Sequence, residues 1–169
     1  MPELQRLRPD HAPALLAFER ENRAFFAASV PDRGDAYFTD FASRHESLLT
    51  EQATGTCHFH VLVAQDGGEI LGRFNLVDIA SGTADLGFRL AKKATGRGLA
   101  TTTVRHLFTL CTDSYTLTTL RAAAAITNTA SRTVLTRTGF VTTGEKVTLS
   151  GKPGLFYARD LLTESRLPS

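Results

Sequence analysis

The sequence predicts an α/β protein with one mixed, mostly antiparallel sheet of about seven strands flanked by about four helices. Two β-rich runs, residues 58–64 and 70–80, surround the turn QDGGE, which is typical of a hairpin. A strand, a glycine turn, a helical pattern and another strand then follow between residues 84 and 126, in the order of a crossover unit. Residues 140–149 and 155–162 indicate a last hairpin around SGKPG.

The elements before the first hairpin are a strand and two helices. Residues 4–8 alternate in polarity, as in a short strand, and Pro9 is suited to open a helix through residues 11–22. Asp35 is expected to cap a second helix, which runs to about Glu51 with phenylalanine and leucine on its buried face.

The elements after the first hairpin complete the sheet. Residues 84–90 make a third consecutive antiparallel strand, and apolar residues recur at helical spacing from Leu99. Residues 116–126 are rich in strand-forming side chains. A short helix over residues 130–138 ends at Gly139, which suits the position after a helix.

Composition favours a single globular domain, residues 1–169, with residues 164–169 as a frayed tail. The chain is 42% hydrophobic and 21% charged, with a net charge of +2 and basic residues spread along its length, which argues against a nucleic-acid partner. No run approaches the roughly 20 apolar residues that cross a bilayer, so no membrane partner is predicted. The polar opening lacks a signal-peptide pattern, and we therefore expect a cytoplasmic protein.

The glycine turn, KATGRGLATT at residues 93–102, combines flexibility with positive charge. Main-chain N–H groups at a helix start lack partners, and the helix dipole makes that end positive. Gly96 and Gly98 let phosphate oxygens approach the main chain, and Arg97 adds a cationic donor. No Walker motif follows, and Thr101 stands where a dinucleotide GxGxxG motif has its last glycine. The turn indicates either a phosphate-bearing ligand or an ordinary strand-to-helix turn.

Two longer segments resemble motifs of a known superfamily. ADLGFRLAKKATGRGLATTTV resembles the acyl-CoA motif of the GNAT N-acetyltransferases, with Lys93 in the place usually held by glutamine or arginine. NTASRTVLTRTGF resembles their second signature, and Asn128 followed by Ser131 is similar to the RimJ/RimL-type branch, which acetylates protein N-terminal amines. GEILGRFNLVDI is similar to the strand pair before the motif, so the resemblance covers roughly residues 4–162.

The resemblance implies how acetyl-CoA binds. The sheet would splay between the strands at residues 84–90 and 119–126, with the pantetheine arm in the opening and the pyrophosphate on the amides of the glycine turn. Asn128 would bind the pantetheine arm, or simply cap its helix, and Ser131 would lie near the thioester sulfur, or simply face solvent. The implied coenzyme-binding residues are Phe88, Arg89, Leu90, Lys93, Ala94, Thr95, Gly96, Arg97, Gly98, Leu99, Ala100, Thr101, Asn128 and Ser131.

Acetyl transfer needs a neutral amine, a polarised carbonyl and a proton for the departing thiolate. Asp85 lies where many GNAT enzymes carry a glutamate, so it is expected to take the amine proton, directly or through water, or else to finish the preceding turn. Glu145 is a second candidate base, or an exposed strand residue. The tyrosine that protonates the thiolate in many relatives is replaced by Leu135, which leaves Ser131 to serve the sulfur.

The acceptor is expected near ENRAFFAASVPDRGDAYF, between the two early helices, where the resemblance places that site. Phe25 and Phe26 would wall the site, or pack in the core. Glu21, Asp32 and Asp35 would attract a cationic amine.

No metal is predicted. His58 and His60 lie on one face of a strand, but no third ligand stands at a recognisable spacing, so we expect a partly exposed sheet face or the acceptor groove. Cys57 and Cys111 lie far apart and outside any CxxC motif, and they are expected to be buried thiols.

The expected function is acetyl-CoA-dependent N-acetylation of a primary amine. Neutralising an α-amino group at pH 7 costs roughly 1.2 kcal/mol, against roughly 4.6 kcal/mol for lysine, which favours a protein N-terminus. A small amine, such as an antibiotic, a polyamine or an amino acid, is the alternative acceptor. A non-catalytic acyl-CoA-binding module is the alternative function, because Leu135 replaces the tyrosine. Similar proteins are commonly homodimers, so a homodimer is a further expectation.

Overall fold

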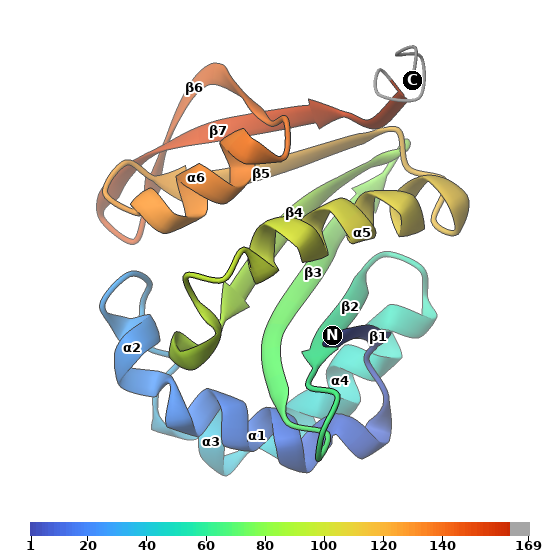
Figure 1. Ribbon diagram of the computed structural model, residues 1–169, viewed down its shortest axis with the longest axis vertical. Helices are drawn as coiled ribbons and strands as arrows, with labels where there is room; N and C mark the ends of the chain where they lie inside the picture. Colours follow the sequence, from blue (N-terminus) through green and yellow to red (C-terminus); the bar gives the residue numbers. More distant parts are fainter. Residues whose placement is uncertain (163–169) are drawn as a thin grey trace. The chain divides into compact units, whose positions relative to one another are not determined.

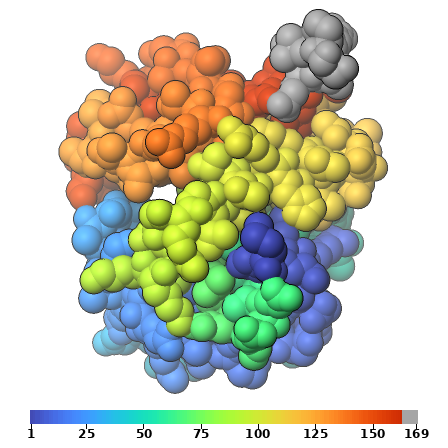
Figure 2. Space-filling model, in the orientation of Figure 1, coloured from blue at the N-terminus to red at the C-terminus, as the bar shows by residue number. Residues whose placement is uncertain are grey.

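Residues 1–162 are described by the computed structural model of the protein, drawn as a ribbon in Figure 1 and as a space-filling view in Figure 2. Within this range seven strands form one sheet with the order β1-β2-β3-β4-β5-β7-β6. Strands β4 and β5 pair in parallel, whereas β1–β2, β2–β3, β5–β7 and β6–β7 pair antiparallel. The strands are β1 (Glu3–Arg6), β2 (His58–Val63), β3 (Ile70–Ala80), β4 (Thr83–Leu90), β5 (Thr119–Ala125), β6 (Val141–Leu149) and β7 (Lys152–Asp160). The predicted mixed, mostly antiparallel sheet is confirmed, and the predicted tail at 164–169 lies outside the described residues.

The described residues contain six α-helices rather than about four, because a further short helix follows the first predicted helix after Asn22 and the second predicted helix is divided at Asp40. Asn22 (φ −105°, ψ 9°) and Asp40 (φ −98°, ψ 19°) leave the helical conformation, as residues do whose side chains compete for main-chain partners. The helices are α1 (Ala12–Glu21), α2 (Arg23–Ala27), α3 (Asp35–Thr39), α4 (Phe41–Ala53), α5 (Leu99–Asp113) and α6 (Thr129–Arg137), with 3-10 helices η1 (Pro9–His11) and η2 (Lys92–Ala94). None of the described helices is long and apolar enough to cross a bilayer.

The start of α3 and the last hairpin turn also differ from prediction. Gly34, with a φ of 87°, is the N-cap residue of α3, and Asp35 is its first residue. The last turn is shorter than SGKPG, because Ser150 and Gly151 alone reverse the chain at φ 51° and 81° and β7 begins at Lys152. Two successive residues at positive φ suit the tight turns that match the twist of a hairpin.

Contacts within the chain define two compact units. The N-terminal unit comprises Met1–Leu76 and Phe88–Arg97, and the C-terminal unit comprises Val77–Gly87 and the chain from Gly98 onward. The single domain predicted for residues 1–169 stays a prediction.

The N-terminal unit has an aromatic and aliphatic core with one buried amide. Phe74 of β3 is fully buried and stacks on Phe88, with ring centroids 5.8 Å apart. Gln52 of α4 donates from Nε2 to the carbonyl of Leu7 at 3.0 Å and accepts from the amide of Phe59 at 2.9 Å. These two bonds join α4 to the chain after β1 and to β2.

The C-terminal unit packs α5 and α6 through side chains at helical spacing. Its fully buried residues include Val104, Leu107, Cys111, Leu120 and Leu135. The parallel pairing of β4 with β5 belongs to this unit and joins Thr83–Asp85 to Thr119–Arg121.

Candidate active site

The glycine turn leads into α5 with a left-handed main chain. Gly96 and Gly98 have φ values of 76° and 72°, and Gly98 is the N-cap residue of α5. A β-carbon at either glycine would meet nothing within 4 Å, so the requirement for glycine is conformational and the space beside the turn is open. No side chain caps α5, and the first described amide of the helix with a main-chain partner is that of Thr102, which donates to Gly98. The amides before Thr102 are therefore available to an anion.

A buried side chain holds the base of this turn. Asn22 accepts from the amide of Lys92 through Oδ1 at 2.9 Å and donates through Nδ2 to the carbonyl of Phe18 at 2.9 Å. The side-chain amide of Asn22 thus links the end of α1 to η2, where the glycine turn begins. Sequence reasoning missed Asn22, because the two partners are 70 residues apart.

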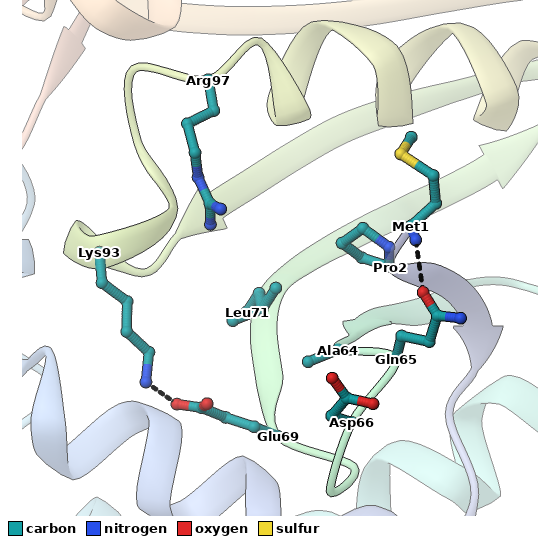
Figure 3. Close-up of a pocket in the computed structure, with 9 residues that line it drawn as sticks. All are labelled: Met1, Pro2, Ala64, Gln65, Asp66, Glu69, Leu71, Lys93 and Arg97. Carbon is teal, nitrogen blue, oxygen red and sulfur yellow. Dashed lines mark hydrogen bonds and ion pairs between the residues drawn. The ribbon is translucent and has the colours of Figure 1, made fainter.

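The cationic side chains of the turn border a cavity of about 310 Å³ (Figure 3). Lys93 forms an ion pair with Glu69, while the guanidinium of Arg97 extends over the cavity without an ion pair to any described residue. The lining residues are Met1, Pro2, Ala64, Gln65, Asp66, Glu69, Leu71, Lys93 and Arg97. A neighbouring carboxylate therefore neutralises the charge of Lys93 more than that of Arg97.

Asp85 lies at the last paired position of β4, directly opposite Arg121 of β5. Burial raises the pKa of the Asp85 carboxyl, the Arg121 guanidinium opposes that rise, and Asp78 adds to it. A carboxylate with a raised pKa is a stronger base than an exposed one. Glu145, the second candidate, is exposed on β6 as expected.

The start of α6 confirms the predicted cap. Asn128 is the N-cap residue, and its Oδ1 accepts from the amide of Ser131 at 3.2 Å. Ser131 is half-buried, and its hydroxyl makes no hydrogen bond to a described residue, so it is free to donate to a ligand. Leu135, in the place of the familiar tyrosine, is fully buried and offers no proton.

The predicted acceptor segment divides between a pocket and the surface. Phe26 and Asp32 line a small pocket, whereas Glu21 and Phe25 are exposed, with Phe25 at 39%. Asp35, also exposed, does not line the pocket either.

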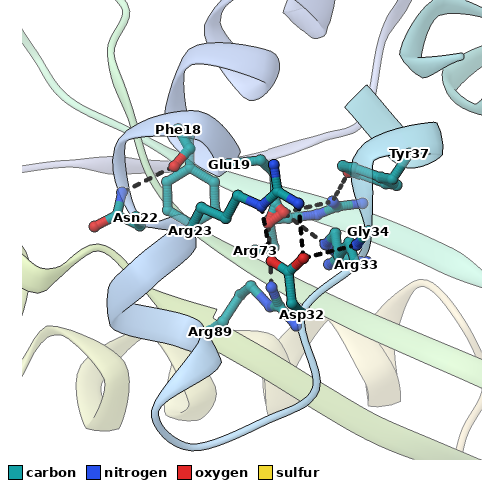
Figure 4. Close-up of polar contacts among 10 residues, drawn as sticks. All are labelled: Phe18, Glu19, Asn22, Arg23, Asp32, Arg33, Gly34, Tyr37, Arg73 and Arg89. Atoms are coloured by element: carbon teal, nitrogen blue, oxygen red, sulfur yellow. Dashed lines mark hydrogen bonds and ion pairs between the residues drawn. The ribbon is translucent and has the colours of Figure 1, made fainter. Parts of the chain in front are cut away.

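The carboxylates predicted to attract an amine already have a cationic partner (Figure 4). Arg23 donates to Asp32 at 2.8 Å and to Asp35 at 2.9 Å. The Arg23 hydrogen bond, with the amide of Gly34, lowers the pKa of Asp32 to about 2. Asp32 and Asp35 therefore offer an incoming amine less negative charge than their number suggests.

The exposure expected for the histidine pair was wrong for His60. His60 is 2% exposed rather than on a partly exposed face, because both faces of β2 at that position are covered, and its Nδ1 lies 3.1 Å from the carbonyl of Phe74. Among residues 1–162, no group of three His, Cys, Asp or Glu side chains is placed to hold a metal. Cys57 and Cys111 are buried free thiols, as predicted, and burial raises the pKa of Cys111 to about 12.

Comparison with known families decides the relationship of the chain. The family model described as an acetyltransferase (GNAT) domain matches residues 3–141. The chain belongs to the GNAT acetyltransferase family. No curated protein sequence matches it.

Solved structures agree in fold with this assignment. The chain is similar to a ribosomal-protein-S5-alanine acetyltransferase from Vibrio fischeri (20% identity, 94% of this chain and 92% of that one, TM-score 0.87). It is also similar to Mycobacterium smegmatis RimJ in complex with CoA-disulfide (23%, 98% and 84%, TM-score 0.84). A third is a spermidine N-acetyltransferase SpeG chimera from Vibrio cholerae and hSSAT (14%, 98% and 99%, TM-score 0.79). At these identities the likeness establishes the fold.

We predict that His60 makes stability depend on pH. Burial lowers the pKa of folded His60 to about 4, whereas an unfolded histidine has its usual value of about 6.5. The unfolded chain thus binds the extra proton first, so stability is full above pH 6.5 and falls by roughly 3 kcal/mol as the pH drops towards 4. Urea unfolding across this range should show a smaller fall for His60→Gln.

The control is His106→Gln, which removes an exposed histidine of α5 and should follow the wild type. Equal pH dependence in His60→Gln and wild type would contradict the assignment.

Proposed function

We propose that the protein is an acetyl-CoA-dependent N-acetyltransferase whose acceptor is a primary amine, most favourably a protein N-terminal amine. The observation that carries the proposal is the glycine turn, where two left-handed glycines leave the first amides of α5 without partners in a chain of the GNAT family.

Acetyl-CoA fits the residues of this turn. Within the predicted range of residues 94–100, the amides of Ala94 and Thr95 already donate to the carbonyls of Ala91 and Lys92 at 2.9 and 3.2 Å. The pyrophosphate would therefore accept hydrogen bonds from the amides of residues 96–100, with Arg97 and the hydroxyl of Thr101 as further donors. The free amides, the open space beside both glycines and the unpaired Arg97 support this placement. Lys93 would have to exchange Glu69 for a phosphate to contribute.

The pantetheine arm would bind along β4 through the main chain of residues 88–90. β4 has 8 residues and β5 has 7, and their parallel pairing joins Thr83–Asp85 to Thr119–Arg121. Asn128 would contribute an amide to the arm in addition to capping α6.

The chemistry is direct attack on the thioester. The amine nitrogen bonds to the acetyl carbonyl carbon, the carbon–sulfur bond breaks, and the sulfur leaves with the electron pair as coenzyme A thiolate. Asp85 takes the proton that the amine loses, through water because its side chain is short. The hydroxyl of Ser131 donates to the sulfur, and a thiol with a pKa near 8.5 needs little further help to leave.

The preference for an N-terminal amine follows from its pKa, which is about 2.5 units below that of lysine, so a modest base suffices. Among the similar structures, one modifies a ribosomal protein and another is named for spermidine. A small-molecule amine therefore remains the second acceptor class.

A non-catalytic acyl-CoA-binding module is the second candidate function. The fully buried Leu135 favours it, because no general acid stands at the usual position. Coenzyme release with a panel of amines separates the two functions, since a module binds acetyl-CoA but releases no coenzyme.

We predict that Gly98→Ala weakens coenzyme A binding at least tenfold, because an alanine resists the left-handed conformation that aims the α5 amides. Isothermal titration calorimetry with coenzyme A measures the effect. Gly144→Ala is the matched control: Gly144 also has a positive φ, of 86°, with open space around it, but it lies on β6. If both variants bound as tightly as wild type, the phosphate site would lie elsewhere.

We predict that Asp85→Asn lowers kcat/KM for an N-terminal peptide by roughly 100-fold or more, because a general base contributes on that scale. Binding of coenzyme A should be unchanged within about threefold. Asp113→Asn, which alters an exposed carboxylate of α5, should behave as wild type. Full turnover in Asp85→Asn would show that another group is the general base.

A further inference from the structure

A buried carboxylate in the N-terminal unit is shared by three arginines (Figure 4). Glu19 of α1 is 1% exposed. Its Oε2 lies 2.8 Å from Nε of Arg33 and 3.7 Å from Nη1 of Arg73, and its Oε1 lies 3.3 Å from Nη1 of Arg89. Three positive charges thus face one negative charge at a site where solvent screens them little.

Aromatic side chains hold these arginines in place. Arg73 donates to the hydroxyl of Tyr37 at 3.0 Å, and the guanidinium of Arg33 lies over the ring of Tyr37, 4.7 Å from its centroid. The guanidinium of Arg89 lies 4.6 Å from the ring centroid of Phe26. The cations are therefore preorganised, so a ligand would bind them at little cost in side-chain entropy.

Arg89 has hydrogen-bonding capacity to spare. Of its donor atoms only Nη1 bonds to a described residue, which leaves Nε and Nη2 available. Burial lowers the pKa of Arg89, and the like charges of Arg33 and Arg73 lower it further, while Glu19 opposes them. An added negative charge would relieve this repulsion.

Two of the three arginines, Arg33 and Arg89, line the small pocket of the acceptor segment. Its volume is about 10 Å³, which is room for a group the size of a water molecule or one carboxylate oxygen. The lining residues are Glu19, Arg23, Phe26, Pro31, Asp32, Arg33, Phe38 and Arg89.

Beside this pocket, negative charges outnumber positive ones. Asp32 and Asp35 share one cation, Arg23, and their side chains are 37% and 94% exposed. Solvent screens these charges more than those around Glu19, so the buried positive charge dominates recognition inside the pocket.

We propose that this pocket binds a carboxylate of the acceptor, so that the enzyme prefers amines whose molecules also carry an acidic group. The inference rests on the proposed function, because residues 88–90 of β4 would hold acetyl-CoA through their main chain while the side chain of Arg89 lines the pocket. The carboxylate is either an acidic side chain of a peptide or the α-carboxylate of an amino acid.

The test uses pairs of acceptors that differ in a carboxylate. It also distinguishes an acidic side chain of a peptide from the α-carboxylate of an amino acid. One arm compares C-terminally amidated peptides that carry Asp or Asn at the second, third or fourth position. The other arm compares amino acids with their amides. We expect kcat/KM to favour the acidic member of at least one pair by about tenfold or more, as a charge-assisted hydrogen bond would give.

The variants Arg89→Gln and Arg33→Gln should reduce this preference to about threefold or less. The preference is a ratio, so a general loss of folded or active enzyme cancels from it. Arg44→Gln is the matched control, because Arg44 also lies over the ring of Tyr37, 5.6 Å from its centroid, but does not contact Glu19. An undiminished preference in both variants, or no preference in the wild type, would overturn the proposal.

A binding measurement keeps the inference distinct from the proposed catalysis. If no amine is acetylated, the proposed function fails, and the pocket is then judged by the NMR signal of the Arg89 Nε–H group. Titration with the same Asp and Asn peptides should shift this signal only when the peptide carries Asp. Equal responses to Asp and Asn peptides would show that the pocket does not select a carboxylate.

Discussion

The main chain at the start of α5 depends on two glycines in the left-handed conformation, Gly96 and Gly98. Another residue would pay about 1–2 kcal/mol to adopt it, and no side chain replaces the missing cap. The amides at the positive end of the helix dipole therefore point to an open surface. Asn22 fixes the beginning of the turn by accepting a hydrogen bond from the amide of Lys92. The proposed coenzyme site, and with it the direction of the thioester, rests on this arrangement.

Local signals in the sequence were sufficient for the sheet and for this turn. Hairpins depend on glycine and on alternating side chains within a few residues, and the glycine turn and the Asn128 cap are likewise contained in short segments. The short helix after Asn22 and the break at Asp40 were missed because the apolar periodicity continues across both residues. The burial of His60 was missed for a different reason, since it depends on which elements cover β2.

The cluster around Glu19 was beyond sequence reasoning because its four members come from α1, the loop before α3, β3 and β4. In the sequence, Glu21, Asp32 and Asp35 suggested an acidic attraction for an amine. In the structure, Arg23 engages Asp32 and Asp35, and the pocket beside them is lined by further arginines. A count of charges along a segment does not give the charge of a site, because partners from distant elements decide which charges remain.

The most direct test of the central claim follows the amide signals of the protein by NMR during titration with coenzyme A. We expect the largest shifts at the amides between Gly96 and Thr101. Dephospho-coenzyme A, which keeps the pyrophosphate but lacks the 3′-phosphate, should shift the same amides. Saturable binding that leaves these amides unshifted would contradict the account.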